Sequence, residues 1–568
     1  MVDLLRRRAA GQPDDRAYVF LSEKESEEAA LTFAELHRRA VIVAAHLATQ
    51  LGKGDRALLM FPSGLDFITA FFGCLVAGVV AVPIMPPRRT SMRNSSESII
   101  ADCGARVLLT TSGLIENRVD IRARLRHIDL EWIAVDTLSP GANDCATESL
   151  ALTREDVAFL QYTSGSTSAP KGVMVTHGNL LENLEMIRLA LGNTPRSTYV
   201  LWIPFYHDMG LVLNVLESFY LGALCVVLSP ATFVQRPLVW LRAIGRYQAE
   251  VASGPNFAFD LCVSRFRAEQ MEDVDLSCWK VALNGAEPVR AATIDQFVAK
   301  FAPYGFDPLT MYPAYGMAEA TLLISGGRRG GGAVTRAASR EALSQGMIVA
   351  PQSKGDTQVL VGCGRALVGE EIAIVDAQSR QRRPVDAIGE IWVRGANVTA
   401  GYWQNSVATA ETFAATIAGE DGAPWLRTGD LGFFDDAGNI YITGRIKDVI
   451  IIYGNNHYPQ DIEATMQSTH PALRQNCGVA FSFVDQRGLE KLVLVQEVER
   501  TQRHQISTDE IENRIREAIS NEHDIGVHEI VLVRPGSIPK TTSGKIQRRL
   551  TQQLWHERAL DVLSPIER

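Results

Sequence analysis

Paired cysteines, a basic excess and an apolar run of membrane length are all missing from this 568-residue sequence. Its eight cysteines are scattered without a Cys-x-x-Cys pair, which argues against a zinc site or a disulfide framework. They indicate buried thiols in a reducing cytosol. The net charge of -9 argues against non-specific nucleic-acid binding as the main activity. We therefore expect a cytoplasmic protein that binds no nucleic acid.

Neither a signal peptide nor a transmembrane segment is predicted. The first residues, Met1–Arg8, lack the apolar stretch of a signal peptide. The uncharged run Phe67–Val82 is shorter than the ~20 residues of a membrane span. Gly73 and Gly78 interrupt this run, and Pro83 follows it. The run predicts a buried helix that leads into a buried strand.

The rest of the sequence has an ordinary globular composition, 46% hydrophobic and 21% charged, and is too long for one core. Thr32 and Glu35 have the spacing of a capping box, and an amphipathic helix is expected after them. Apolar runs then alternate with helical segments; they lie near 57–61, 79–82, 107–109 and 133–135. This alternation predicts α/β layers with largely parallel sheets.

The most informative stretch is Tyr162–Gly172, which is rich in Ser, Thr and Gly and lies between two strand-like runs. The backbone N–H groups of such a loop form an anion-binding concavity, and Lys171 adds a compact positive charge. A Walker A loop is excluded, because Pro170 and Gly172 stand where that motif needs Gly and Ser or Thr. A plain surface loop is the alternative, but Pro-Lys-Gly at this offset favours phosphate binding.

This stretch resembles the signature loop of the acyl-adenylate-forming enzymes, which include acyl-CoA synthetases, luciferases and peptide-synthetase adenylation domains. The resemblance spans about residues 31–549. It implies a large N-terminal domain (1–446) of layered α/β subdomains plus a small β-subdomain, and a smaller mobile α+β C-terminal domain (447–568). The implied cofactors are ATP and Mg²⁺. In the loop, the resemblance assigns nucleotide binding to Thr163, Ser164, Gly165, Ser166, Thr167 and Lys171.

Two later motifs resemble further parts of the nucleotide site. The turn Asn284-Gly285-Ala286-Glu287 resembles the adenine-binding turn, although a plain turn is the alternative. Tyr315-Gly316-Met317-Ala318-Glu319 offers a flat face for a purine and a hard oxygen ligand for Mg²⁺. A core Tyr with a solvated Glu is the other interpretation. As the Tyr-Gly-x-Thr-Glu motif, it makes Glu319 a catalytic residue and metal ligand, with Ala318 in place of the usual Thr.

The resemblance assigns four more positions. His207, in Trp202–Leu211, lies in the wall between the acyl pocket and the nucleotide, where we expect a substrate-gating role and no base role. Asp430 and Arg445 match the two ribose contacts, and Lys447 matches the hinge residue. Some residues could line an acyl tunnel or belong to the core: Phe205, Met209, Leu211 and Phe257.

The C-terminal part carries the expected catalytic lysine. Strands are predicted near 479–481 and 492–496. A helix capped by Ser507 and Glu510 is expected to place three isoleucines on one face, namely Ile511, Ile515 and Ile519. In the tail, Ser-Gly-Lys-Ile resembles the catalytic lysine loop, so Lys545 is the candidate for the essential cation.

Three features resemble the fatty acyl-AMP ligase branch. These are Ala318 with the residues after it, the run Tyr453–Asp461, and an insertion at about 325–358 that mixes Gly and Arg. No hydrophobic period holds in the insertion, which predicts a long irregular loop. Either it is a tolerated surface insertion, or it restrains the C-terminal domain and disfavours transfer to CoA.

The branch implies a two-step reaction: ATP-dependent activation of a fatty acid to fatty acyl-AMP with release of pyrophosphate, then acyl transfer to the phosphopantetheine thiol of a holo acyl carrier protein. The carrier would act in trans or belong to a longer polypeptide. We expect a monomer. The Arg-rich insertion and the Arg548-Arg549 tail are candidate docking surfaces.

Three alternatives remain open. A fatty acyl-CoA synthetase shares every nucleotide motif. A non-catalytic acyl-nucleotide-binding module is disfavoured by the intact Lys545, Glu319 and Lys171. A P-loop NTPase is disfavoured by the missing Walker Gly.

Overall fold

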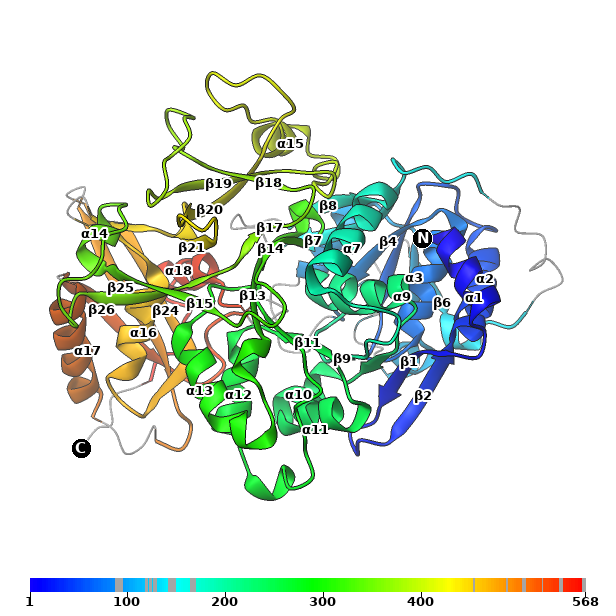
Figure 1. Cartoon of the computed structure of the whole chain (residues 1–568), viewed down its shortest axis with the longest axis horizontal. Helices are drawn as coiled ribbons and strands as arrows, with labels where there is room; N and C mark the ends of the chain where they lie inside the picture. Colours follow the sequence, from blue (N-terminus) through cyan, green and yellow to red (C-terminus); the bar gives the residue numbers. More distant parts are fainter. Residues whose placement is uncertain are drawn as a thin grey trace.

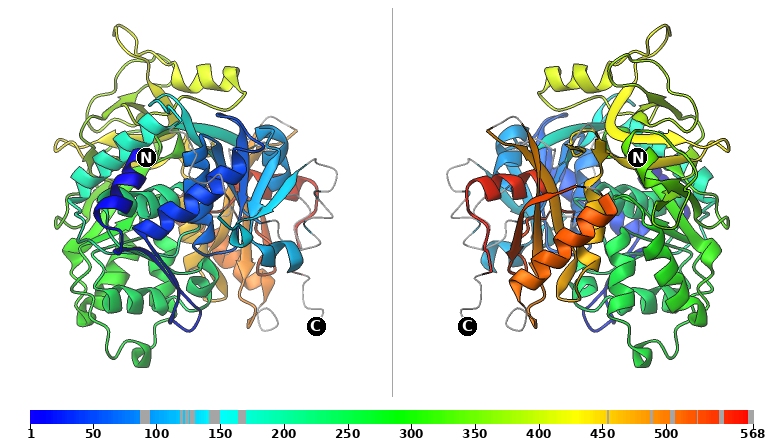
Figure 2. Two further views of the ribbon diagram at one scale, coloured as in Figure 1. Left: turned by 90° about the vertical axis from the view of Figure 1, so that its right-hand side faces the viewer. Right: turned by 90° about the vertical axis from the view of Figure 1, so that its left-hand side faces the viewer.

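The computed structural model describes residues 1–86, 95–117, 121, 125, 130–140, 150–163, 170–452, 455–486, 489–502, 507–523, 525–540 and 545–563. Two β-sheets with helices on their faces form most of the large part of the chain, and a third sheet lies beside them (Figure 1). A separate small C-terminal domain packs against one side, as the two side views in Figure 2 show in orange and red. This arrangement confirms the predicted α/β fold class.

The first sheet confirms the alternation of strands and helices. Its order is β6-β5-β3-β4-β7-β8, and the paired strands are parallel except for the antiparallel pair β7 and β8. The strands are β3 (Arg56–Met60), β4 (Val80–Ile84), β5 (Val107–Thr110), β6 (Glu131–Ala134), β7 (Val157–Thr163) and β8 (Lys171–Thr176). The helices of this region are α1 (Val2–Gly11), α2 (Phe33–Leu47), α3 (Asp66–Ala77), α4 (Ser95–Cys103) and α5 (Ser112–Asn117).

Two local predictions are confirmed here. Thr32 and Glu35 form a reciprocal capping box at the start of α2, with side chain to backbone distances of 3.2 and 3.0 Å. The apolar run Phe67–Val82 forms the buried helix α3 and leads into the buried strand β4. In the described part of the chain, no helix combines the length and the apolar character that a membrane crossing needs.

The second sheet runs in the order β17-β14-β13-β12-β11-β9-β10-β1-β2. Its centre, from β13 to β1, is parallel, and antiparallel strands lie at both edges. The strands are β1 (Arg16–Leu21), β2 (Glu27–Thr32), β9 (Tyr199–Leu201), β10 (Cys225–Val227), β11 (Val251–Gly254), β12 (Val281–Asn284), β13 (Met311–Gly316), β14 (Leu323–Gly326) and β17 (Arg365–Ala366).

Helices accompany this sheet, and one hydrophobic cluster joins it to the first sheet. They are α7 (His177–Leu191), α8 (Asp208–Gly210), the π-helix η3 (Leu211–Leu216), α9 (Glu217–Leu221), α10 (Pro230–Gln235), α11 (Leu238–Tyr247), α12 (Asn256–Ser264) and α13 (Ala291–Phe301). The four candidate tunnel residues pack with this cluster: Phe205, Met209 and Leu211 are buried in it, and Phe257 lies partly buried against it.

The third sheet is the predicted β-subdomain, in the order β15-β16-β21-β20-β19-β18. Its elements are β15 (Val334–Ser339), α14 (Arg340–Ser344), β16 (Thr357–Gly362), β18 (Glu371–Val375), β19 (Gly389–Arg394), α15 (Ser406–Phe413), β20 (Leu426–Phe434) and β21 (Ile440–Arg445).

The insertion at 325–358 is not the irregular loop that its sequence predicts, so that prediction was wrong. Ser325 and Gly326 complete β14, and β15 and α14 lie inside the segment. β15 forms a regular antiparallel ladder with β16. Three of the six side chains of β15 are exposed and only Ala338 and Ser339 are buried, so backbone hydrogen bonds to β16 hold most of the strand, and no hydrophobic period marks it.

The C-terminal domain is α+β, as expected. Strands β24 (Leu473–Val484), β25 (Glu490–Val498) and β26 (Val527–Val533) form its sheet, and β22 (Ile450–Ile452) pairs with β23 (Asn455–His457). The helices are α16 (Pro459–Ser468), α17 (Thr508–His523) and α18 (Arg548–His556). The three isoleucines predicted on one face of α17 are buried. The domain boundary at 446/447 stays a prediction.

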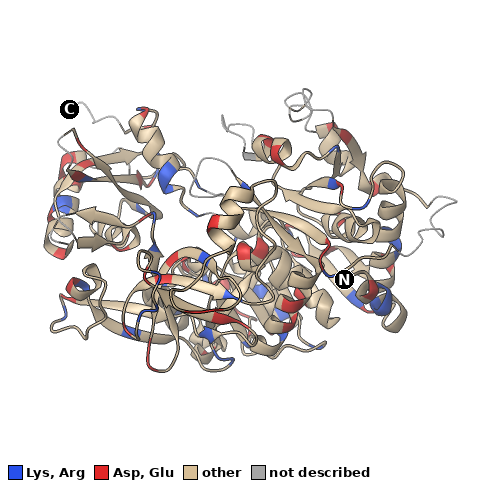
Figure 3. Cartoon of the chain, turned by 90° about the horizontal axis from the view of Figure 1, so that it is seen from above, with Lys and Arg blue, Asp and Glu red and all other residues tan. Residues whose placement is uncertain are grey.

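Charged residues of both signs occur in both domains. Basic and acidic segments are interspersed on both domains in the view of Figure 3. The cysteines within the described residues are free, and all but Cys278 are buried, which confirms the interpretation of buried thiols for that part of the chain.

Candidate active site

Four motifs of the sequence meet because they follow neighbouring strands of one parallel sheet. Strands β9, β11, β12 and β13 are adjacent and parallel. The motifs near 202–211, 253–257, 284–288 and 315–319 stand at their carboxyl ends. In open α/β sheets, ligands bind in the crevice outside the carboxyl ends of the strands. This edge of the second sheet is therefore the candidate active site.

Asp430 lies between Tyr315 and Arg445. The Tyr315 hydroxyl donates to Oδ2 of Asp430 at 2.8 Å, and Nε of Arg445 donates to Oδ1 at 2.8 Å. The register of β20 and β21 places Asp430 directly opposite Arg445, so the ion pair follows from strand pairing. Because each carboxylate oxygen can accept more than one hydrogen bond, Asp430 can still accept hydroxyl groups of a ligand.

An ion pair with a buried carboxylate holds the part of strand β20 that carries Asp430. The Glu390 side chain is 2% exposed and accepts hydrogen bonds from Arg427 at 2.7 and 3.0 Å. Its other oxygen accepts the backbone N–H of Gly429 at 3.3 Å. The carboxylate of Glu390 on β19 thereby ties the first half of β20, which leads to Asp430, to its neighbouring strand.

The turn after β12 is tight and strained. Nδ2 of the buried Asn284 donates to Asn256 at 3.2 Å. A Cβ at Gly285 would lie 2.9 Å from the carbonyl oxygen of Ala314, so the turn passes close to β13. Ala286 has φ of 69°, a left-handed conformation that is rare for alanine and is often found at functional sites.

Glu287 ends this turn beside the N-terminal end of α12. It accepts the backbone N–H of Phe257 at 3.3 Å. Burial raises the pKa of the Glu287 carboxyl, and the nearby Arg290 and Lys545 counteract this effect. Glu287 therefore lies within electrostatic reach of a cation from each domain, Arg290 in the large domain and Lys545 in the small domain.

The motif after β13 presents Glu319 on a short 3₁₀ turn, η7 (Ala318–Ala320). A Cβ at Gly316 would lie 1.9 Å from the carbonyl oxygen of Leu322, so only glycine fits there. The backbone N–H of Met317 donates to that same carbonyl at 2.8 Å. The chain thus folds back on itself and directs Glu319 into the interior.

Glu319 is linked to Lys171 through Tyr402. The Tyr402 hydroxyl donates to Oε1 of Glu319 at 2.8 Å, and Nζ of Lys171 lies 4.6 Å from the centre of the Tyr402 ring. Burial raises the pKa of the Glu319 carboxyl, while the Tyr402 hydrogen bond lowers it. Lys171 is the first residue of β8 and ends the predicted phosphate loop. Tyr402 therefore contacts both this loop and the predicted metal ligand Glu319.

His207 begins α8 and contacts the next residue. Its Nδ1 lies 2.6 Å from Oδ1 of Asp208. The backbone N–H of Met209 lies within hydrogen-bond distance of two acceptors, 3.1 Å from Nδ1 of His207 and 2.7 Å from Oδ1 of Asp208. The π-helix η3 follows α8 directly, and π-helical turns frequently occur at functional sites.

Lys545 reaches this edge from the small domain. It is partly buried, and burial lowers the pKa of its ammonium group, while Asp208, Glu287 and Asp430 raise it. Burial alone would raise the pKa of the Asp208 carboxyl. The nearby His207 and Lys545 act in the opposite direction more strongly, so this pKa lies below its usual value. The ammonium of Lys545 therefore lies within electrostatic reach of three carboxylates of the large domain.

The structure brings together predicted residues from five parts of the chain: 171, 207, 284–287, 315–319 and 430–445, with Lys545 added by the second domain. Thr163 ends β7, and Lys447 lies between β21 and β22. Residues 164–169 of the predicted phosphate loop lie outside the described residues, and they include four of the residues assigned to nucleotide binding: Ser164, Gly165, Ser166 and Thr167.

The donor groups fit a magnesium ion that is held jointly with a nucleotide. Within the described ranges, no group of three or more His, Cys, Asp or Glu could hold a metal ion by itself. Mg²⁺ is usually bound through one or two carboxylates plus substrate phosphates and water. The single buried carboxylate of Glu319 beside Lys171 matches that pattern.

Sequence reasoning missed Tyr402 and the role of Asp208. Tyr402 stands in a Gly-Tyr-Trp turn, which has no residue pattern that points to a site. The sequence offered one indication for Asp208, since it directly follows the candidate residue His207. Its electrostatic partner Lys545 lies 337 positions later in the sequence, and only the arrangement of the two domains brings them together.

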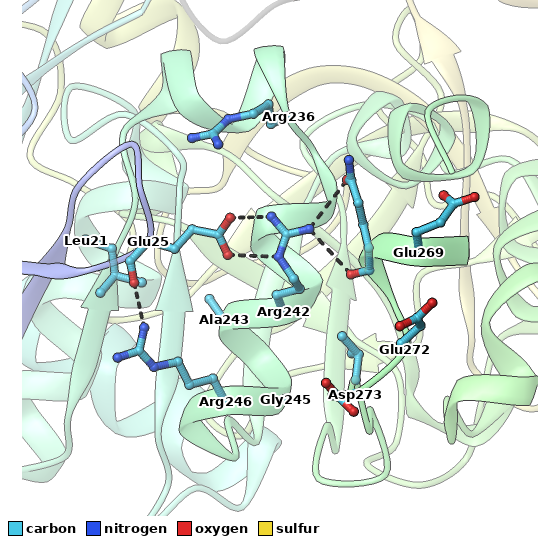
Figure 4. A pocket seen from close by; sticks show the side chains of 12 residues that line it. Leu21, Glu25, Arg236, Arg242, Ala243, Gly245, Arg246, Glu269, Glu272 and Asp273 are labelled. Carbon is cyan, nitrogen blue, oxygen red and sulfur yellow. Dashed lines mark hydrogen bonds and ion pairs between the residues drawn. The ribbon is translucent and has the colours of Figure 1, made fainter. Parts of the chain in front are cut away.

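A pocket of about 570 Å³ lies away from this constellation, between α11, the β1–β2 turn and the segment before residue 275. Figure 4 shows the guanidinium of Arg242 between Glu25 and Gln270, with Arg246 bonded to the backbone of Glu25. None of its lining residues belongs to the predicted site.

Comparisons with known proteins identify the family of the chain. Residues 5–403 match the family described as AMP-binding enzyme, and residues 447–564 match the Disco-interacting protein 2-like AMP domain. The chain is 43% identical over 571 residues to the medium-chain-fatty-acid–[acyl-carrier-protein] ligase JamA of Moorena producens, covering 99% of this chain and 96% of that protein. It is 38% identical over 573 residues to a fatty-acid–CoA ligase, fadD25, of Mycobacterium tuberculosis, covering 98% and 97%.

A solved structure extends the comparison to three dimensions. The fatty acyl-adenylate ligase of Legionella pneumophila, in complex with acyl adenylate and pyrophosphate, is 37% identical and superposes with a TM-score of 0.76 over 99% of this chain and 97% of that one. The chain belongs to the AMP-binding enzyme family and, within it, to the fatty acyl-AMP ligases.

Proposed function

We propose that this protein activates a fatty acid with ATP to fatty acyl-AMP and then passes the acyl group to the thiol of a holo acyl carrier protein. The observation that carries the proposal is the position of Lys545, which the small domain holds within electrostatic reach of Asp208, Glu287 and Asp430 of the large domain. A cation there can neutralise charge between a carboxylate and a phosphate. The acyl-adenylate bound to the Legionella relative supports the first product.

In the first step, a carboxylate oxygen of the fatty acid attacks the α-phosphorus of ATP. The new bond joins the carboxylate oxygen to the α-phosphorus and gives a mixed carboxylic–phosphoric anhydride. The bond from the α-phosphorus to the bridging oxygen breaks, so that pyrophosphate leaves with the electron pair. The acid is already ionised near neutral pH, so His207 is assigned no base role. Positioning and charge neutralisation carry the catalysis, with Lys545 between the two anionic groups.

The nucleotide is held by groups from four places. The backbone and hydroxyls of Thr163–Thr167, with Lys171, bind the β- and γ-phosphates. The turn Asn284–Glu287 and the Tyr315 ring bind adenine, and Gly316, Met317 and Ala318 border the α-phosphate. Asp430 and Arg445 hold the ribose. Glu319 would hold Mg²⁺, which would neutralise phosphate charge when bound.

In the second step, the carrier thiol attacks the acyl carbonyl carbon. A carbon–sulfur bond forms, the bond to the AMP oxygen breaks, and the thiol proton leaves to solvent. In the present arrangement the small domain holds Lys545 within electrostatic reach of the large-domain carboxylates. We therefore propose that the small domain turns about Lys447 before the thiol enters.

The insertion restrains the small domain in this proposal. Nη1 of Arg340, at the start of α14, lies 3.2 Å from Glu522 on α17. Gln358, at the other end of the insertion, lies near Asp461 on α16. Burial raises the pKa of Asp461 to about 6, and Gln358 counteracts this effect. Two contacts thus tie the β-subdomain to the small domain, and they would disfavour the arrangement needed for a free CoA thiol.

The relative JamA is named for medium-chain fatty acids, so we propose a medium-chain acid as the substrate class. We also propose a cytoplasmic location, because the free and mostly buried cysteines of the described residues suit a reducing compartment. We further propose that the protein is a monomer. Light scattering of the purified chain tests the monomer, and a fusion to a fluorescent protein tests the location.

A pyrophosphate-release assay with dodecanoic acid tests the first step. We expect release that depends on the acid, on ATP and on Mg²⁺. Thioester formation is then compared for free CoA and for a holo acyl carrier protein. Acylation of the carrier but not of CoA is expected, and efficient CoA thioester formation would contradict the assignment to a carrier-dependent ligase.

A further inference from the structure

One hydrogen bond joins α12 of the large domain to β24 of the small domain. Nδ2 of Asn476 donates to Oδ2 of Asp260 at 3.1 Å. The same oxygen accepts a hydrogen bond from Nη2 of Arg290 at 2.6 Å. Arg290 therefore orients the carboxylate of Asp260, which presents a fixed acceptor to the small domain.

Asn476 is held rigidly in the small domain. Its φ is 57°, in the left-handed region that Asn adopts more readily than most residues. The register between β24 and β25 shifts between Leu473 and Gly478, so Asn476 lies in an irregular part of the strand. Its backbone N–H donates to Oε1 of Gln467 on α16 at 2.7 Å. The Asn476 side chain is thus directed at the large domain by its own backbone.

The backbone of Asn476 is also connected to the segment of Lys545. Nζ of Lys540 donates to the carbonyl oxygen of Asn476 at 2.8 Å. Lys540 in turn pairs with Ile546 in an antiparallel bridge, so it stands opposite the neighbour of Lys545. The Asp260 carboxylate, Asn476, Lys540 and Lys545 form one continuous connection.

We propose that Asp260 and Asn476 are positioning residues for Lys545. Their hydrogen bond exists only in the domain arrangement that brings Lys545 to the carboxyl edge, so it stabilises that arrangement over others. It therefore supports formation of acyl-AMP and has no part in the later transfer to a thiol. The inference rests on the proposed function, which supplies these two steps.

The decisive variant is Asn476→Asp. It keeps the size of the side chain and the tolerance for positive φ, but it places a second carboxylate against Asp260. This variant loses the hydrogen bond to Asp260 and adds repulsion between two carboxylates. We expect adenylation to become about tenfold slower. Asn476→Gly, which tolerates the left-handed backbone and only removes the contact, is expected to slow it by about threefold to fivefold.

The exchange of the two groups tests whether the contact itself matters. In the double variant Asp260→Asn with Asn476→Asp, the amide and the carboxylate trade places, and Arg290 remains beside the pair. Adenylation is expected to return to within about threefold of the original rate. Asn513→Asp adds the same charge to the exposed face of α17 in the same domain and serves as the matched control.

Each half-reaction is measured separately on the full-length chain. Fatty-acid-dependent exchange between ATP and pyrophosphate, with dodecanoic acid, reports adenylation. Transfer from synthetic dodecanoyl-AMP to pantetheine, as a carrier surrogate, reports the second step without adenylation. Thermal unfolding of every variant checks the fold.

The expected result is slower exchange in Asn476→Asp, an unchanged or faster transfer, recovery in the double variant and no effect in Asn513→Asp. Equal loss of both half-reactions, or exchange unchanged in Asn476→Asp, would overturn the positioning role while leaving the proposed function intact. Absence of fatty-acid-dependent exchange in the unsubstituted chain would instead overturn the proposed function and, with it, this inference.

Discussion

The hydroxyl of Tyr402 donates a 2.8 Å hydrogen bond to Oε1 of Glu319, across 83 positions of the sequence. The ring of the same tyrosine lies 4.6 Å from Nζ of Lys171. One side chain thus touches the candidate metal ligand and the lysine of the candidate phosphate loop. Tyr402 orients Glu319 in the way that outer hydrogen-bond partners orient metal-binding carboxylates.

Replacing Tyr402 by Phe removes this hydrogen bond and keeps the ring under Lys171. We expect the Mg²⁺ concentration for half-maximal pyrophosphate release to rise about tenfold. Tyr441→Phe is the control, since its hydroxyl bonds to Asp435 at 3.1 Å in the β-subdomain. An unchanged Mg²⁺ requirement in Tyr402→Phe would show that Tyr402 does not orient a metal ligand.

Replacing Lys545 by Ala removes the cation between carboxylate and phosphate. Adenylation is expected to fall ~10²-fold or more, because preorganised charge at that point is lost. ATP affinity, measured by calorimetry, should change little. Lys491→Ala, at the start of β25 in the same domain, is the matched control. A loss of only twofold would argue that Lys545 is not the essential cation.

Glu370 gives a prediction for the pH dependence of stability. It is buried and accepts a 2.7 Å hydrogen bond from Asn397, and burial raises its pKa from 4.5 to about 9. Between these two values, the folded state keeps a proton that the unfolded state has released. The stability that this group contributes is therefore complete below pH 4.5 and is lost as pH rises toward about 9.

Glu370→Gln keeps the shape of the protonated acid without this dependence. We expect it to stabilise the fold by ~1–3 kcal/mol at about pH 8 and by less at about pH 6. Thermal unfolding at both pH values measures the difference, with the exposed Glu411→Gln as control. Equal shifts at both pH values would contradict a protonated Glu370.

The contact between Arg340 and Glu522 predicts a small effect. Their side chains are 32% and 44% exposed, and such ion pairs contribute at most ~1 kcal/mol. Arg340→Glu is expected to raise acyl transfer to free CoA about threefold by loosening the small domain. Adding Glu522→Arg should reverse the gain. If CoA transfer stays unchanged in Arg340→Glu, this contact does not restrain the domain.

The sequence by itself determined the local elements and the identity of the site motifs. The capping box at Thr32, the buried helix after Asp66 and the isoleucine face of α17 were predictable, because caps and hydrophobic periods depend on residues within a few positions. The motifs around Asn284 and Tyr315 were recognised by their resemblance to a family's motifs, and the structure places them at the ends of adjacent parallel strands. Strand β15 was not predicted, because backbone groups make its pairing with β16 and its side chains show no hydrophobic period.

Only the tertiary structure decided which distant groups touch. Tyr402 on Glu319, Tyr315 on Asp430 and Asn476 on Asp260 each join segments 83 to 216 positions apart. Such contacts depend on strand order, on register and on how the two domains meet. Strand order, register and domain contacts depend on the packing of the whole chain, because many weak contacts in both domains together select one arrangement. No short stretch of residues determines that total.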